Sequence, residues 1–251
     1  MNTQRLDLVD ALRGLAMLWM TAYHFCFDLN QAGYLRQNFY DDPLWTWQRT
    51  CILSLFLLCA GAGQALALHQ GQSWARFGRR WLQIAGCALL VSAGSALMFP
   101  QSYIYFGVLH GMAVMLVLVR LSASWGRWLW PLGALAIAMK FIAKTLMDTW
   151  ASAHFINEKT WNWLGWVNVR PVTEDYVPLI PWLGVMWWGV AATQWWLARP
   201  AGRAGHARPV PLPRAALRPL AVLGRWSLSY YMLHQPVLLG ALWVWATLLR
   251  H

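Results

Sequence analysis

The chain has 251 residues, of which 59% are hydrophobic and 12% charged, and its formal net charge is +11. Soluble globular domains carry about 25% charged residues, so this composition argues against a soluble protein and favours one that crosses a membrane several times. The twenty tryptophans agree, because Trp gathers at membrane interfaces. Apolar runs recur from end to end, which predicts one integral membrane domain over residues 1–251.

A helix needs roughly 20 residues to cross the hydrocarbon core of a bilayer. The first such run is interrupted by Asp7, Asp10 and Arg13, unlike the apolar core of a signal peptide, so we expect it to be retained. The Pro-, Gly- and Arg-rich stretch 200–219 is predicted to be an irregular cytoplasmic linker. The apolar runs predict an all-α, polytopic transmembrane bundle of about seven spans, near 9–29, 44–68, 81–99, 104–122, 129–147, 179–199 and 225–249.

The charged residues divide unevenly between the two sides of this predicted bundle. With the N-terminus in the cytoplasm, thirteen arginines and two aspartates fall on the cytoplasmic side, against seven cationic and seven acidic residues on the other. Cytoplasmic loops of membrane proteins carry an excess of Lys and Arg. The whole net charge of +11 therefore falls on the cytoplasmic side, which supports the span count and a cytoplasmic N-terminus. Because this topology explains the basic composition, nucleic-acid binding is not needed to explain it.

A narrow stripe of polar and methionine side chains runs along the first predicted helix. At a spacing of four residues the Asp28 carboxylate can reach the His24 imidazole, fix its tautomer and stabilise the imidazolium. This pair is a candidate general base, and the alternative is a histidine held by a capping aspartate for packing alone. We expect Asp10 and Arg13 to pair with each other or with the last helix. The stripe, which must face protein, comprises Asp10, Arg13, Met17, Met20, His24 and Asp28.

Other predicted helices bring polar residues to the same outer depth. Arg49 would clamp an anion or carbonyl oxygen, or simply reach the interface. His110 is a second candidate base or a satisfied core histidine. Asp175 and Tyr176 are predicted to open the sixth helix, where Asp175 either binds substrate or caps the helix. Ionisable groups that meet at one depth favour a site. The substrate-binding candidates are Arg49, Asp175, Tyr176 and Tyr105.

Two other features concern how the helices pack. In the last predicted helix, Pro236 follows His234 and Gln235 and frees a backbone carbonyl one turn earlier. Polar groups beside such a break either line a cavity or bond to neighbouring helices. The small residues Gly61 and Gly63 predict close packing of the second helix against the third. The cysteines have no metal-ligand spacing, so neither a zinc site nor a disulfide framework is expected.

Four segments together resemble the bacterial members of the heparan-alpha-glucosaminide N-acetyltransferase catalytic-domain-like family: RLDLVDALRGLAML with YHFCFDL, YFGVLHGMAV, DYVPLIPWLGV and SLSYYMLHQPVLLG. The resemblance implies transfer of an acetyl group from cytoplasmic acetyl-CoA, the cosubstrate, to a glycan or other small acceptor at the periplasmic face. It also implies a protein integral to the bacterial inner (plasma) membrane and in contact with lipid. The sequence leaves open whether the protein is a homo-oligomer.

The resemblance extends to particular residues. Asp10 and Arg13 match the opening motif of the family, and His24 falls where the lysosomal enzyme has a polar active-site residue. The essential histidine of that enzyme lies in its first non-cytoplasmic loop, whereas this chain has no histidine between Asp28 and His69. His24 or His110 would therefore act as the base.

These inferences combine into one hypothesis for the reaction. His24, oriented by Asp28, or else His110, would remove a proton from the acceptor, while Arg49 binds the acceptor or the developing oxyanion. The phosphates of CoA need cations. The cofactor-binding candidates are Arg13, Arg76, Arg79, Arg80, Arg225 and His234.

Two other classes of function fit the same intramembrane residues. Histidines on facing helices can hold haem, and among His24, His110 and His234 the first two are predicted to lie at the same depth. Neither of their helices has a second histidine at haem spacing. In a transporter of a small molecule or ion, the stripe on the first helix would form a polar pathway.

Overall fold

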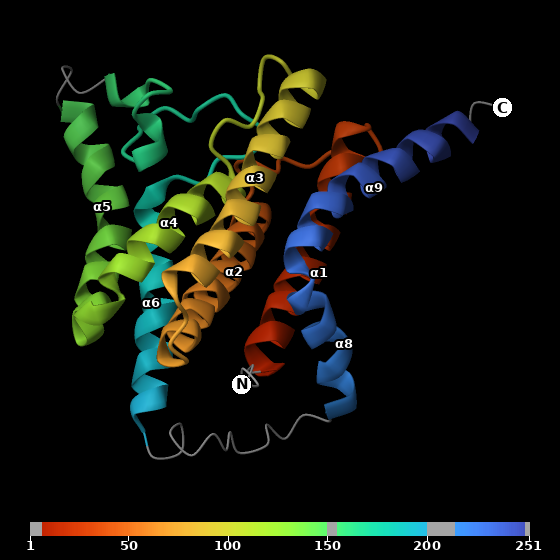
Figure 1. Cartoon of the computed structure of the whole chain (residues 1–251). Coiled ribbons are helices and arrows are strands. Elements are labelled where there is room, and N and C mark those ends of the chain that lie inside the picture. The colour runs from red at the N-terminus through yellow and green to blue at the C-terminus, as the bar shows by residue number, and fades with distance from the viewer. Residues whose placement is uncertain (1–6, 150–154, 200–213, 249–251) are drawn as a thin grey trace. The chain divides into compact units, whose positions relative to one another are not determined.

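The computed structural model describes residues 7–149, 155–199 and 214–248, which form helices and the loops that join them (Figure 1). The predicted all-α class is confirmed. Within the described ranges, two short 3-10 helices, η1 (Ala123–Trp128) and η3 (Asn162–Leu164), lie in the connections. The α-helices are α1 (Asp7–Gln31), α2 (Pro43–His69), α3 (Trp74–Met98), α4 (Val108–Ser122), α5 (Leu129–Thr149), α6 (Leu179–Ala198), α8 (Arg214–Arg225) and α9 (Ser227–Leu248).

Each apolar run predicted from the sequence corresponds to one of these helices, but the stretch 200–219 does not end as predicted. Its part up to residue 213 lies outside the described residues, and from Arg214 the chain is helical as α8. The prediction of an irregular linker was wrong there, because Leu217, Leu220 and Gly224 recur at helical spacing and give α8 a face that packs on α1.

Three helical segments of the described chain are long and apolar enough to cross a membrane: Pro43–His69, Trp74–Met98 and Val108–Ile142. The last of these runs through α4, η1 and α5. The count of seven spans and the cytoplasmic N-terminus stay predictions.

The chain forms two compact units. Unit 1 comprises residues 1–59 and 209–251, and therefore holds α1, the first part of α2, α8 and α9. Unit 2 comprises residues 60–208, with the remaining helices. The single domain over residues 1–251 stays a prediction.

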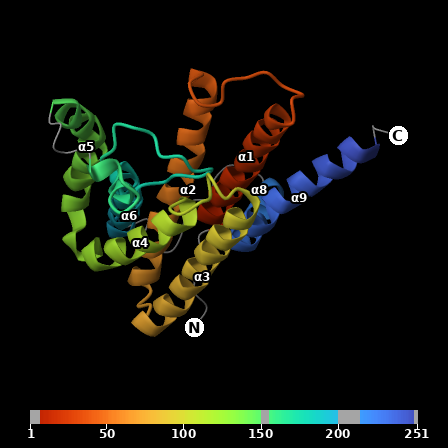
Figure 2. The same ribbon diagram turned by 90° about the horizontal axis from the view of Figure 1, so that it is seen from above.

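In unit 1, α1 and α8 lie side by side (Figures 1 and 2). Their backbones touch at two glycines. A Cβ atom built on Gly14 would lie 2.0 Å from the Leu220 carbonyl oxygen, and one on Gly224 would lie 1.8 Å from the Asp10 carbonyl oxygen. Only glycine allows so close an approach. Farther along, α1 packs through a hydrophobic core comprising Met17, Met20, Tyr23, Phe39 and Ile52.

In unit 2, small residues bring α5 and α6 together, and Figure 2 shows the two helices as neighbours. A Cβ atom on Gly184 would lie 2.4 Å from the Gly133 carbonyl oxygen. Gly61 of α2 also packs on α6, because a Cβ atom there would lie 2.2 Å from the Met186 carbonyl oxygen. The predicted packing of Gly61 against the third helix is therefore wrong. Small residues mark a close contact in the sequence but do not name the helix that makes it.

The C-terminal end of α4 in unit 2 is fixed by a buried cation. The Arg120 guanidinium donates from Nη1 to Gln72 Oε1 at 3.0 Å and from Nη2 to the Gln72 carbonyl oxygen at 2.5 Å. It also lies 4.8 Å from the ring centroid of Trp74 and 4.9 Å from that of Phe77. Neutral oxygens and aromatic faces thus take the place of a carboxylate around this charge.

Candidate functional site

A buried polar cluster in unit 1 joins α1 to α9. We call its four members, His24, Asp28, His234 and Gln235, the histidine cluster. The imidazole rings of His24 and His234 have centroids 5.2 Å apart. Asp28 is only 4% exposed, and its two carboxylate oxygens lie 2.8 and 3.1 Å from Gln235 Nε2, which donates to them. The sequence predicted that the stripe on α1 faces protein, but it did not predict these partners from α9.

The hydrogen bond predicted between Asp28 and His24 is not formed. The Asp28 carboxylate turns instead to the Gln235 amide of the neighbouring helix. In the described part of the chain no hydrogen bond to the His24 ring is found; its edge contact is with Tyr23. An amide from α9 thus competes successfully for the carboxylate, because α9 packs against the same face of α1. The catalytic roles of His24 and Asp28 stay predictions.

His234 was assigned to the cofactor from the sequence, and in unit 1 it lies beside His24. Its Nδ1 atom is 2.7 Å from the Tyr231 carbonyl oxygen, one turn earlier in α9. Its ring stacks on Tyr230 with an interplanar angle of 9°. The Tyr230 hydroxyl lies 2.7 Å from the hydroxyl of Thr21 on α1. His234 is therefore held in one orientation by its own helix and by α1.

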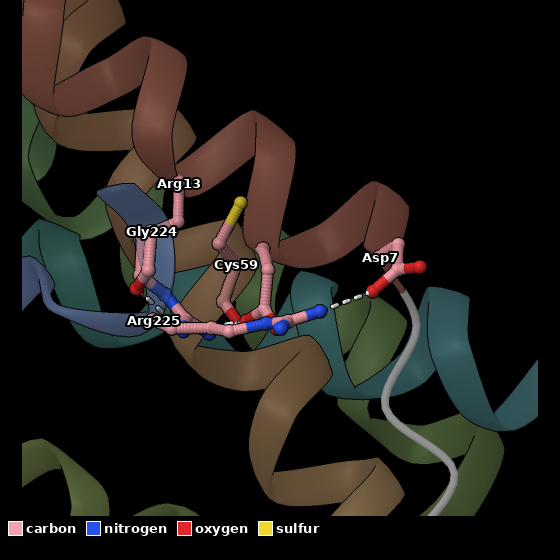
Figure 3. Close-up of polar contacts among 6 residues, drawn as sticks. Asp7, Arg13, Cys59, Gly224 and Arg225 are labelled. Atoms are coloured by element: carbon pink, nitrogen blue, oxygen red, sulfur yellow. Dashed lines mark hydrogen bonds and ion pairs between the residues drawn. The ribbon is translucent and has the colours of Figure 1, made fainter. Parts of the chain in front are cut away.

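A second polar cluster in unit 1 lies where α1 meets α8 and is shown in Figure 3. Arg13 Nη1 lies 3.1 Å from Asp10 Oδ1, and Arg225 approaches Asp7 at 2.6 Å and Asp10 at 3.5 Å. Arg13 also donates to the carbonyl oxygens of Gly224, at 3.5 Å, and Cys59, at 3.4 Å. The predicted pairing of Asp10 with Arg13 is confirmed.

This arrangement bears on the predicted cofactor site. The charges of Arg13 and Arg225 are balanced by carboxylates within unit 1, so their role in CoA binding stays a prediction. Arg76, Arg79 and Arg80 have exposed side chains in the first two turns of α3 in unit 2. Arg49, on α2 in unit 1, is also exposed.

In unit 2, the His110 ring is engaged at both nitrogens. Nδ1 accepts a hydrogen bond from the Gly107 amide at 3.3 Å, so the neutral ring carries its proton on Nε2. Nε2 lies 3.0 Å from Ser92 Oγ, which donates in turn to the Ile104 carbonyl oxygen at 2.7 Å. Of the two interpretations left open, this geometry matches a satisfied core histidine at the start of α4. The catalytic role of His110 stays a prediction.

Asp175 was predicted to open or cap the sixth helix, and the structure corrects this. α6 begins at Leu179 after the N-cap residue Pro178, whereas Asp175 Oδ2 accepts a hydrogen bond from the Val108 amide, at the start of α4, at 2.7 Å. The loop pairs Tyr176 with Phe106 through a backbone bridge, and this pairing carries the carboxylate to α4. A carboxylate is favourable there because the first amides of a helix lack intrahelical partners.

The tyrosines predicted to bind substrate take part in a hydrogen-bond network around Asn162, which is 1% exposed. Asn162 Nδ2 donates to Tyr105 Oη at 2.7 Å, and Tyr176 Oη donates to the Asn162 carbonyl oxygen at 2.5 Å. Burial raises the pKa of Tyr176, so its hydroxyl stays protonated and able to donate. The network fixes the loop before α6, and the sequence did not single out Asn162.

The candidate residues that were predicted to meet at one depth belong to two different units. His24, Asp28 and Arg49 belong to unit 1, and His110 and Asp175 belong to unit 2. That they form one site stays a prediction.

A cavity of about 380 Å³ opens in unit 1 where α1 runs into the loop that leads to α2. Phe27, one turn after His24, is part of its wall. The other lining residues are mostly amides and aromatics: Asn30, Gln31, Leu35, Arg36, Gln37, Asn38, Phe39 and Tyr40. This cavity was not predicted from the sequence, although the loop is visibly rich in Asn and Gln.

The chain was compared with curated proteins, solved structures and protein families. No curated protein and no solved structure matches the chain. The family described as "Heparan-alpha-glucosaminide N-acetyltransferase, catalytic" matches residues 5–236. The match includes the histidine cluster, the α1–α8 ion pairs and every other candidate site residue. The chain therefore belongs to the heparan-alpha-glucosaminide N-acetyltransferase catalytic family.

Proposed function

We propose that the protein is a membrane-embedded acetyltransferase that moves an acetyl group from acetyl-CoA to a hydroxyl or amine of a sugar-type acceptor. Family membership supports the class of reaction and the donor. The observation that carries the proposal is the pair of imidazoles, His24 and His234, between α1 and α9. Acetyl transfer to a hydroxyl or ammonium group needs a base for the acceptor proton, and histidine serves most often.

The cavity at the end of α1 supports a sugar as acceptor. Asn30, Gln37 and Arg36 offer the donors and acceptors that hydroxyl groups require, and Phe39 and Tyr40 offer apolar faces. Because Phe27 lies both in the cavity wall and one turn from His24, an acceptor bound there would be near the histidine cluster. The positive-inside pattern favours a periplasmic location for this end of α1.

The donor is proposed to enter from the opposite, cytoplasmic side. Among the candidate cations, Arg76, Arg79 and Arg80 are exposed at the start of α3, and charge-assisted hydrogen bonds from arginine suit the phosphates of CoA. Arg13 and Arg225 are already in ion pairs with Asp10 and Asp7, so the exposed Arg76 and Arg79 of α3 are the stronger candidates. Arg49 would bind the acceptor or the developing oxyanion, as predicted from the sequence.

The test uses purified full-length protein. We expect it to bind acetyl-CoA in calorimetry and to acetylate a glucosamine-type acceptor, with the product identified by mass. Replacing Arg76 and Arg79 by Glu should raise the KM for acetyl-CoA, whereas Arg36→Ala should raise the KM for the acceptor only. A protein that binds no acyl-CoA contradicts the proposal. A Soret band would favour haem binding instead, and solute flux into liposomes without acetyl-CoA would favour transport.

A further inference from the structure

The tautomer of His234 is set by its backbone partner. The Tyr231 carbonyl oxygen, 2.7 Å from His234 Nδ1, can only accept a hydrogen bond, so Nδ1 must carry a proton. In the neutral ring the lone pair is then on Nε2. This is the opposite of His110, whose Nδ1 accepts from a backbone amide and whose Nε2 carries the proton.

The Nε2 atom of His234 is buried and has no hydrogen-bond partner among the described residues. A buried polar atom without a partner costs free energy and calls for an explanation. Its residue is 9% exposed and sits beside the His24 ring in the histidine cluster. The basic lone pair of His234 Nε2 is thus held in a fixed position and can accept a proton. It lies where two ionisable residues of α1, His24 and Asp28, meet α9.

We infer that His234, through Nε2, is the catalytic base that deprotonates the acceptor. The inference rests on the proposed acetyl transfer and changes which histidine performs it. The Tyr231 bond persists in both protonation states of the ring, because Nδ1 donates in each. It therefore orients the ring before and after proton transfer, as the carboxylate orients the histidine of a catalytic triad. The buried Asp28 carboxylate, bound to the adjacent Gln235, provides negative charge in the same cluster.

His234 Nε2 takes the proton as the acceptor oxygen or nitrogen attacks the carbonyl carbon of the acetyl thioester, forming the new C–O or C–N bond. The C–S bond breaks, and the CoA sulfur leaves with its electron pair. His234 then returns the proton to that sulfur, giving CoA thiol and acetylated acceptor. His24 has a different role here: its ring lies against the base, and it stays neutral while His234 carries the proton, because two charged rings 5.2 Å apart repel.

The deciding experiment compares His234→Asn with His24→Asn in the purified full-length protein. Asparagine at position 234 keeps an N–H near Nδ1 to donate to Tyr231 but has no atom at Nε2. We expect kcat to fall by about 10²–10⁴-fold, as for loss of a general base, with the KM for acetyl-CoA within threefold and the melting temperature unchanged. His24→Asn should cost less. His69→Asn, at the exposed end of α2, is the control and should match the wild type.

The outcomes distinguish a wrong assignment of the catalytic base from a failure of the proposed acetyl transfer. If His234→Asn keeps kcat within tenfold of an active wild type, the inference is wrong and the proposed function stands. If the wild type transfers no acetyl group, the proposed function itself fails. Where both histidine variants lose more than 100-fold, ¹⁵N spectra of the wild-type imidazoles decide, with the His234 signal assigned by its loss in His234→Asn. A proton on Nδ1 of His234 supports the inference, and a proton on Nε2 overturns it.

Discussion

At the scale of single residues, the structure is most informative where a buried polar group has found an unexpected partner. Asp28 is bound by Gln235, a residue 207 positions away, and His110 is bound by Ser92 and the Gly107 amide. Each of these residues was a catalytic candidate by its type and depth. Their partners now distinguish a histidine that is fully hydrogen-bonded, His110, from one with a free lone pair, His234.

Removing the Gln235 amide should destabilise unit 1. Gln235→Ala leaves the Asp28 carboxylate buried without its donor, and hydrogen bonds to charged groups contribute about 1.5–3 kcal/mol. We expect a loss of that size in the free energy of unfolding, measured by denaturant titration in detergent micelles. In the double variant with Asp28→Ala the two losses should be less than additive. The exposed Gln31→Ala is the control, and strictly additive losses would contradict the contact.

At the scale of elements, backbone contact through glycine organises the helix pairs of both units. Gly14 and Gly224 bring α1 to α8, and Gly133 and Gly184 bring α5 to α6. Such contacts let two helix backbones approach closely and pack by van der Waals contact. The α1–α8 contact also brings Arg225 within reach of Asp7 and Asp10.

A methyl group at position 224 should separate α1 from α8. Gly224→Ala would put a Cβ atom 1.8 Å from the Asp10 carbonyl oxygen, and backbone cannot yield as a flexible side chain would. We expect a loss of about 1–3 kcal/mol or more, as for overpacking, seen as a lower melting temperature. Gly86→Ala on α3 meets open space and should be neutral or slightly stabilising, because Ala is the better helix former. Equal melting temperatures would refute the contact.

Replacing the buried Arg120 by lysine should lower the stability of the protein. Arg120→Lys keeps the charge but cannot make two hydrogen bonds to Gln72 from a planar fork. We expect a loss of about 1.5–3 kcal/mol, the range for hydrogen bonds to charged groups, measured by unfolding in micelles. Arg127→Lys, at an exposed position in η1, is the control. A stability equal to that of the wild type would show that the charge alone suffices.

At the scale of the whole molecule, the main prediction concerns the path of the chain through the membrane. The arginine excess predicts a cytoplasmic N-terminus, while three helical segments of the described chain satisfy the length and hydropathy of a span. The direction in which α2 crosses would decide on which side acetyl-CoA and the acceptor bind.

Cysteine labelling can test this topology across α2. In a variant whose native cysteines are replaced by serine, Tyr34→Cys and Ala75→Cys flank that helix at exposed positions. We expect a membrane-impermeant maleimide to label position 34 in spheroplasts, and position 75 only after lysis. The reverse pattern contradicts the orientation. Labelling of both positions before lysis contradicts α2 as a span.

The sequence by itself determined the helical class, the extent of most helices and the polar stripe on α1, because apolar length and a repeat of three to four residues are local properties of the chain. Family membership was also predictable from four short segments. Only the tertiary structure decided the partners: Gln235 for Asp28, α4 for Asp175, α6 for Gly61 and a helix at Arg214–Arg225. Those contacts join residues far apart in sequence, and which donor reaches a buried group depends on how the helices pack. For that reason the sequence predicted only that a histidine acts as the base, whereas our inference that this base is His234 rests on the hydrogen bonds of the folded chain.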